Sequence, residues 1–189
     1  MSKHRLLSVL MLAFVFLAPS CLPFRQEQRT YVLVPEMGTP TVTQPNLTLE
    51  AVLLPGYLDR YEMVYLAKSG ELVKVRKAKW AQPLGALLKD NLSVALRQRN
   101  TSDTPKGAIV LELEHFLTDE SGAFQVTGFL EYRPVPVGQP AIRHAVSFTL
   151  PSLGSPNANR IVLQSKAALS RLADMMCSDE LIHPADFNP

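Results

Sequence analysis

At 189 residues, with 47% hydrophobic side chains, the chain is long enough for a single domain with its own core. Its formal net charge of +2 comes from Lys3 and Arg5, because the chain from residue 21 onwards holds 17 basic and 17 acidic side chains. Because these charges balance, the chain lacks the excess of basic residues that is typical of nucleic-acid-binding proteins. Its two cysteines are too few for a disulfide scaffold.

Residues 1–20 have the pattern of a secretory signal peptide. A basic start is followed by an apolar run over residues 6–18, which is too short to span a bilayer stably. Small residues precede Cys21 as in a bacterial lipobox, although Pro19 departs from that motif. We therefore expect a lipoprotein signal peptide and acylation of Cys21, with an ordinary signal peptide as the alternative. Leu22, rather than an aspartate, follows the cysteine, and this favours sorting to the outer membrane.

The next part of the chain predicts a tether and two strands. Residues 21–30 are mostly polar and are expected to link the membrane to the domain. Residues 31–34 are β-prone and end at a proline, which predicts an edge strand. After a loop over residues 37–45, residues 47–53 alternate between apolar and polar and predict a strand that buries Leu47, Leu49, Ala51 and Leu53.

A hairpin and a helix are expected next. Two β-prone runs, residues 62–66 and 72–76, flank a Lys-Ser-Gly turn signal. Pro83 suits the first turn of a helix, and leucines at helical spacing follow it to about residue 99. Residues 100–107 contain a proline and a glycine and predict a loop that ends this helix.

The remainder predicts a three-strand meander and a second helix. Period-two alternation runs through residues 108–117, 123–132 and 141–150. Ser155 and Pro156 then have the pattern of an N-cap and a first-turn proline, before an amphipathic helix that reaches about Cys177. We predict an α+β, two-layer fold in which two helices cover a mostly antiparallel sheet, with one domain over residues 31–177 and a mobile tail over residues 178–189.

No motif of a catalytic, metal or cofactor site stands out. The histidines lack metal-ligand spacing, and no nucleophile elbow, phosphate loop or dinucleotide fingerprint occurs. His115 and His144 lie in strands of the same meander and are expected to make ordinary hydrogen bonds, with a metal pair as the remote alternative. Cys177 lies in an apolar helical segment, which predicts a buried, inert thiol. The sequence therefore predicts no enzyme, no metal and no cofactor.

The most distinctive stretch is a short apolar run that stops at Pro55 and is followed by polar and aromatic residues. Asp59 and Arg60 are adjacent, so that a local ion pair holding the turn is one interpretation. A structural role and a role at a partner or subunit interface both remain open, because aromatic residues and arginine are enriched at interfaces. The interface candidates are Tyr57, Leu58, Asp59, Arg60, Trp80, Pro83 and Leu84.

These residues carry a family resemblance. Leu-Pro-x-Tyr-Leu-Asp-Arg over residues 54–60, followed by Trp-Ala-x-Pro-Leu over residues 80–84, resembles the PqiC/YmbA family of ABC-type transport auxiliary lipoproteins. Gly56 within the first motif and Pro19 in the lipobox are the departures from its pattern. The lipobox-like start, the first strand and the meander with its last helix extend the resemblance over nearly the whole chain.

The resemblance implies an outer-membrane lipoprotein that faces the periplasm and supports envelope integrity. By this resemblance its partners are an MCE-domain protein, PqiB-like, and inner-membrane subunits of a lipid transport system, and its assembly is a homo-oligomeric ring. A pilotin-like or assembly lipoprotein of another outer-membrane machine is the alternative, and a small envelope hydrolase is the enzymatic rival.

Overall fold

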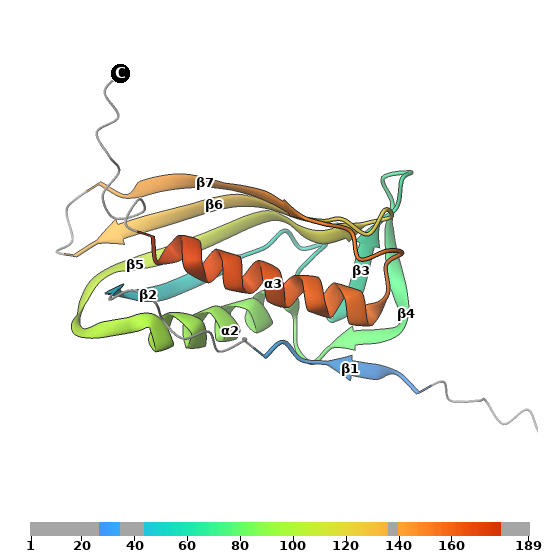
Figure 1. The fold of residues 1–189 in the computed structure, drawn as a ribbon, viewed down its shortest axis with the longest axis horizontal. Helices are drawn as coiled ribbons and strands as arrows, with labels where there is room; N and C mark the ends of the chain where they lie inside the picture. The colour runs from blue at the N-terminus through green and yellow to red at the C-terminus, as the bar shows by residue number, and fades with distance from the viewer. Residues whose placement is uncertain (1–26, 35–43, 136–139, 179–189) are drawn as a thin grey trace, which may run out of the picture.

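One mixed sheet with two helices on it forms the fold (Figure 1). The structure, a computed structural model, describes residues 27–34, 44–135 and 140–178. Its elements are β1 (Arg29–Tyr31), β2 (Gln44–Leu53), β3 (Glu62–Leu66), β4 (Leu72–Trp80), α2 (Leu84–Arg99), β5 (Asn100–Asp119), β6 (Phe124–Pro134), β7 (Ile142–Leu150) and α3 (Ala158–Met176). The predicted signal peptide over residues 1–20, Cys21 and the tail beyond residue 178 lie outside the described residues.

The 20-residue strand β5 is the axis of the sheet. The strand order is β1-β4-β3-β5-β6-β7, and β2 also pairs with β5. One edge of β5 carries β6, whereas the other edge carries β2 along its first part and β3 at its end. β5, β6 and β7 form a consecutive antiparallel meander, and antiparallel ladders hold most of the paired residues. The predicted α+β fold is thus confirmed.

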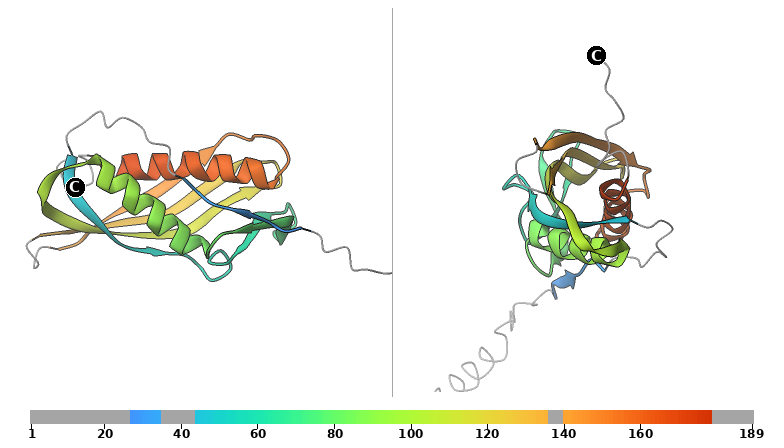
Figure 2. Two further views of the ribbon diagram at one scale, coloured as in Figure 1. Left: turned by 90° about the horizontal axis from the view of Figure 1, so that it is seen from below. Right: turned by 90° about the vertical axis from the view of Figure 1, so that its left-hand side faces the viewer.

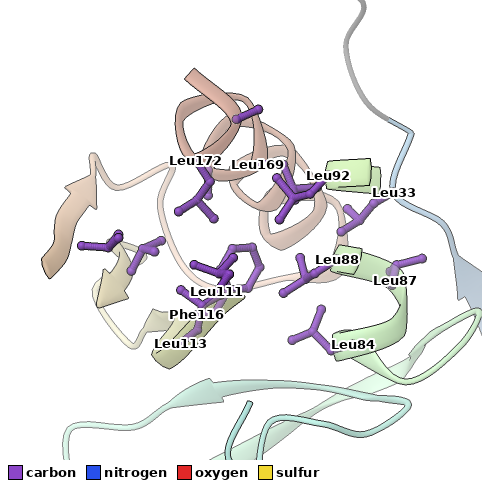
Figure 3. Packing of buried hydrophobic residues seen from close by; sticks show 14 of the residues in the cluster. Leu33, Leu84, Leu87, Leu88, Leu92, Leu111, Leu113, Phe116, Leu169 and Leu172 are labelled. Carbon is purple, nitrogen blue, oxygen red and sulfur yellow. The ribbon is translucent and has the colours of Figure 1, made fainter. Parts of the chain in front are cut away.

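Both helices lie on the same face of the sheet, and the core fills the space between them (Figure 2). Each strand of the meander turns alternate side chains inward, as the pattern in β6 shows, where Phe124, Val126 and Leu130 are buried. From α2 the side chains of Leu88 and Leu92 reach the same core (Figure 3). The periodicities of the sequence therefore place the core correctly in these elements.

The predicted loop over residues 100–107 is wrong, because this segment is the first part of β5. It pairs in parallel with β2, with register shifts on either side of the pair Asn46 and Pro105. Gly107 contacts β6 so closely that an added Cβ would lie 2.7 Å from the Arg133 carbonyl oxygen and against the Tyr132 ring. Pairing with distant strands thus overrides the local turn signal of the proline and the glycine.

Two further boundaries differ from the prediction. The first strand, β1, is an edge strand as expected, but it begins at Arg29 and so takes in the last two residues of the predicted tether. The N-cap of α3 is Asn157 rather than Ser155, since the Asn157 side chain accepts a hydrogen bond from the Arg160 N–H at 3.1 Å. The carbonyl of Ser155 instead accepts a hydrogen bond from the Arg160 side chain at 2.8 Å.

Candidate functional site

The motif stretch fills a gap along one edge of β5. β2 ends its pairing with β5 at Leu53 and Glu112, and β3 resumes pairing only at Tyr65 and Thr118. Residues 54–61 connect these two strands across the gap, and we call this segment the notch loop. The loop turns tightly, because the Pro55 carbonyl accepts hydrogen bonds from the N–H groups of Leu58 and Asp59 at 2.8 and 3.1 Å. A proline followed by a glycine suits such a turn.

Tyr57 ties the notch loop to the sheet. Its hydroxyl donates a hydrogen bond of 2.8 Å to the carbonyl oxygen of Glu114. Glu114 is the extra residue of a β-bulge, because Leu113 pairs with Gly128 while His115 pairs with the adjacent Thr127. The hydroxyl therefore satisfies a carbonyl at a place where the ladder is interrupted.

Asp59 caps the helix that starts 25 residues later in the chain. Its Oδ1 accepts a hydrogen bond from the Gly85 N–H at 3.0 Å, and the Arg60 carbonyl accepts one from the Leu84 N–H at 3.3 Å. The first turn of α2 has no acidic residue of its own, so Asp59 supplies the negative charge that a helix N-terminus favours. The predicted local ion pair between Asp59 and Arg60 is not among the ion pairs of the described residues.

Three of the interface candidates lie in the core beneath the notch loop. Leu58, Trp80 and Leu84 are 2%, 3% and 4% exposed, respectively. The Trp80 N–H also donates a hydrogen bond of 2.7 Å to the Tyr61 carbonyl, which fixes the end of the loop to β4. Pro83 is half-buried, and its carbonyl accepts the Leu87 N–H at 3.0 Å. Within this chain, the buried three hold the loop in place.

The large exposed side chains of the notch loop and of the residue before it are apolar and aromatic, beside the exposed carboxylate of Asp59. Leu53 and Tyr61 are each 51% exposed and Tyr57 is 39% exposed. Beside them a shallow pocket of about 470 Å³ is lined by Leu53, Leu54, Pro55, Tyr57 and residues 112–115. The side chain of Arg60 is half-buried, and its Nε has no hydrogen-bond partner within the described residues. We call Leu53, Tyr57, Arg60 and Tyr61 the notch residues.

Sequence reasoning missed Leu53 and Tyr61. Leu53 was expected on the buried face of its strand, and that prediction is wrong. A register shift between Leu49 and Ala51 reverses the alternation, so the later part of β2 turns Leu53 outward. Tyr61 directly follows the motif at the end of the notch loop, and only the structure shows that its ring is exposed.

The two strand histidines lie on opposite faces of the sheet. The Nδ1 of His115 is 2.7 Å from the Thr127 hydroxyl on the face away from the helices, whereas His144 pairs with Leu130, whose side chain is in the core. Among the described residues no group of three potential metal ligands occurs. The expected ordinary hydrogen bond is thus found for His115 but not for His144, whose buried Nε2 has no hydrogen-bond partner within the described residues. A metal pair of the two is contradicted by their opposite faces.

Cys177 is buried at the C-terminal end of α3, as predicted. Its side chain is 3% exposed, and burial raises the pKa of the thiol from 9.0 to about 11. A thiol with such a pKa is protonated at neutral pH and is a poor nucleophile. Cys177 therefore belongs to the packing of the domain.

Comparisons with known proteins identify the family. The family model described as "ABC-type transport auxiliary lipoprotein component" matches residues 31–177. The chain belongs to this family. The resemblance carried by the two motifs is thereby confirmed, and this auxiliary lipoprotein is a component of an ABC-type transport system.

Solved structures share the fold of this auxiliary lipoprotein. One, described as the crystal structure of an uncharacterized protein, has a TM-score of 0.61 at 18% identity and covers 79% of this chain and 97% of its own. Another, protein XCC0632 from Xanthomonas campestris of the family model DUF330, has a TM-score of 0.59 at 16% identity, with 82% and 96% covered. None of the curated proteins compared matches the chain. Within the described residues, no helix has the length and apolar character to cross a membrane.

Proposed function

We propose that this auxiliary lipoprotein is a non-catalytic outer-membrane subunit of an MCE-type and ABC-type intermembrane lipid transport system. In this role, acyl chains on Cys21 hold the domain at the periplasmic side of the outer membrane. The domain then docks the periplasm-spanning MCE component and so supports envelope integrity. The work of transport is done elsewhere in the complex, by the inner-membrane subunits.

The match of residues 31–177 to a transport auxiliary lipoprotein carries this proposal. Two or three acyl chains hold a protein at a membrane durably, because each buried CH₂ contributes about 0.8 kcal/mol. An anchored domain without its own transport machinery is suited to positioning a partner. We assign its partners as an MCE-domain protein, PqiB-like, and further copies of this chain in a ring.

The notch residues supply the proposed docking surface. Tyr57 and Tyr61 present large rings at the surface, and the half-buried Arg60 lies between them in the chain, although its Nε is itself buried. Aromatic side chains and arginine carry much of the binding energy at protein interfaces. Of the remaining candidates, Asp59 and Pro83 are accessible at the edge of this surface, whereas Leu58, Trp80 and Leu84 would act by holding the loop.

Photocrosslinking in living cells tests the proposal. A benzophenone amino acid replaces Tyr61, which is half-exposed and makes no side-chain hydrogen bond within the described residues. The matched control carries the same group at Ala167, an exposed position on α3. Captured proteins are identified by mass spectrometry. We expect position 61, and not position 167, to capture an MCE-domain protein or a second copy of this chain.

Two other results would contradict the proposal. Capture of a component of another outer-membrane machine would favour the pilotin-like alternative. No capture from an anchored and folded chain would make the motif purely structural. Separately, a purified chain that hydrolyses lipid or ester, and loses this activity on one side-chain change, would overturn the non-catalytic role.

A further inference from the structure

Three turns gather at one end of the molecule. Residues 67–71 join β3 to β4, residues 120–123 join β5 to β6, and residues 151–157 join β7 to α3. The sheet register places them together, because Leu66 pairs with Asp119 and Phe124 pairs with both Thr118 and Leu150. This three-turn end lies at the right of Figure 1. The link between β6 and β7 lies at the opposite end, after Pro134.

The chain enters the fold from the side of the three-turn end. β1 runs parallel to β4, with Arg29 beside Ala78 and Tyr31 beside Trp80. These partners are the last three residues of β4, so β1 lies at the end of that strand away from the turn of residues 67–71. In Figure 1, β1 starts at the right and runs inward. A hydrogen bond of 3.3 Å from the Tyr31 hydroxyl to Asn159 joins β1 to the start of α3.

The segment between Cys21 and the first described residue is short. Five residues lie between Cys21 and Glu27, the first described residue, and the six Cα–Cα steps from one to the other reach at most about 20–22 Å. The 11 residues of β6 run from the three-turn end to the opposite end and span about 36 Å. An anchor at Cys21 therefore holds the three-turn end near the bilayer.

We propose that the three-turn end faces the lipid headgroups, with the long axis of the domain directed away from the membrane. The inference rests on the acylation of Cys21 in the proposed function. In this orientation the end of β6 at Pro134 points into the periplasm, and the notch loop lies along the side of the domain between the two ends. The three-turn end thus contacts the surface of the bilayer that holds the acyl chains.

Hydrogen bonds between the three turns make the three-turn end rigid. The Lys68 N–H donates a hydrogen bond of 2.6 Å to the Glu120 carboxylate. The Ser152 hydroxyl donates one of 2.5 Å to the Ser121 carbonyl. From α3, the amide of the buried Gln164 donates to the carbonyls of Gly122 and Pro151 at 2.8 and 3.0 Å. These bonds join the turns into one unit.

The charged side chains of the three turns suit contact with a membrane that does not depend on strong electrostatic attraction. Lys68 and Arg160 are offset by Glu71, Asp119 and Glu120, so that the three turns themselves form no basic cluster to bind anionic lipid. The exposed Arg29, Arg76 and Lys77 lie instead where β1 pairs with β4. Leu153 is the large apolar side chain exposed there, at 44%. The acyl anchor therefore supplies the affinity, and the contact should be insensitive to salt.

Site-specific quenching tests the orientation. Single cysteines at Ser69→Cys, Leu153→Cys, Val135→Cys and Ala167→Cys are labelled with a fluorophore in the full, acylated chain. Cys177 is buried, so the unsubstituted chain serves as the labelling blank. The protein is reconstituted in vesicles of phosphatidylethanolamine and phosphatidylglycerol that contain a phospholipid with a nitroxide headgroup. Flotation of the vesicles reports anchoring independently of the fluorescence.

We expect positions 69 and 153 to lose fluorescence, and positions 135 and 167 to keep it, at both low and high salt. Equal loss at position 135 or 167 from chains that float would overturn the orientation, since the domain would then lie flat or face the other way. Chains that are not acylated and do not float would overturn the anchor itself. The absence of acylation would contradict both the proposed function and this inference. Equal loss at position 135 or 167 would contradict the orientation alone.

Discussion

Asp59 supplies a helix cap from a distant loop. Its carboxylate accepts the Gly85 N–H at 3.0 Å, across 26 residues of sequence. Gly85 allows this approach, because a Cβ there would lie 3.0 Å from the Asp59 Oδ1. The motif thus links the end of β2 to the start of α2, whichever partner contacts the exposed residues around it.

Replacing Asp59 should weaken the domain through the loss of this cap. We expect Asp59→Ala to lower the free energy of unfolding by about 1 kcal/mol, and Asp59→Asn to lower it less, because the amide oxygen still accepts a hydrogen bond. The measurement is urea denaturation followed by circular dichroism.

Asp90→Ala is the matched control for this cap. Asp90 is an exposed carboxylate on α2 that bonds only the side chain of Gln82, at 2.8 Å, and its loss should change stability by less than about 0.5 kcal/mol. Equal losses from Asp59→Ala and Asp90→Ala would mean that the contact with Gly85 does not stabilise α2.

Cys177 makes stability depend on alkaline pH. Burial raises the pKa of the folded thiol to about 11, above the value of 9.0 in an unfolded chain. Below pH 9 the thiol is protonated in both states and its contribution is constant. Between pH 9 and pH 11 only the unfolded chain releases the proton, so the free energy of unfolding should fall by about 2–3 kcal/mol.

Denaturation of the native chain and of Cys177→Ala at pH 8 and pH 11 measures this difference. The alanine variant should lose less stability over this range. Tyr132, whose pKa burial also raises, is present in both chains and cancels in the comparison. Parallel losses in the two chains would show that the thiol ionises equally in the folded and unfolded states.

The pairing of β5 with β6 depends on a bulge and a glycine. Gly128 lies against the backbone of β5, where an added Cβ would meet the Glu112 carbonyl oxygen and lie 2.8 Å from the Leu113 Cα. The bulge directly after Leu113 then places the Glu114 carbonyl where the Tyr57 hydroxyl reaches it at 2.8 Å. The position of the notch loop therefore depends on close approach between two strands.

Gly128→Ala should separate these strands and destabilise the domain. Because the neighbouring atoms belong to the backbone, we expect a loss of about 1–3 kcal/mol, measured as a lower urea midpoint. Gly56→Ala is the control, since no atom lies within 4 Å of a Cβ at this loop position, and its effect should stay within about 0.5 kcal/mol. A neutral Gly128→Ala would refute the close approach.

Across the whole molecule, the sheet has two edges and two different faces. The N-terminal strand β1 forms one edge of the sheet and β7 forms the other. Both helices cover a single face, whereas the other face carries ion pairs such as Glu112 with Arg143 at 2.8 Å. This polar face is suited to contact with water. The ends of the domain and the notch loop are therefore the surfaces that we assign to the membrane and to a partner.

Removal of residues 1–21 tests the proposed lipid anchor. Replacing residues 1–21 with a secretory signal peptide that lacks a cysteine should move the protein from the outer-membrane fraction to the soluble periplasmic fraction. We expect this because acyl chains on Cys21 provide the proposed attachment. Cell fractionation with density-gradient separation of the two membranes measures the change. Retention in the outer membrane after a high-salt wash would show that another part of the chain provides the attachment.

Much of the fold was predictable because its signals are local. Alternation placed Phe124, Val126 and Leu130 in the core, and helical spacing did the same for Leu88 and Leu92. The Lys-Ser-Gly turn between β3 and β4 also marked its hairpin correctly. Each of these signals involves residues within a few positions of one another, so no knowledge of distant contacts is needed.

Three of the predictions that failed involve residues far apart in the chain. Residues 100–107 have loop composition but form a strand, because β2 and β6 pair with them. Leu53 follows an apolar alternation but is exposed, because a register shift within β2 changes the face it occupies. Asp59 bonds Gly85 rather than pairing with its neighbour Arg60.

The sequence by itself determined the helices, most strands and the family, since periodicity and the two motifs are written in consecutive residues. Only the tertiary structure decided that Leu58, Trp80 and Leu84 are buried while Leu53, Tyr57 and Tyr61 are exposed. The physical reason is that exposure near the notch loop depends on where β2 stops and β3 resumes along β5. That arrangement is set by pairing between strands more than 50 residues apart in the chain.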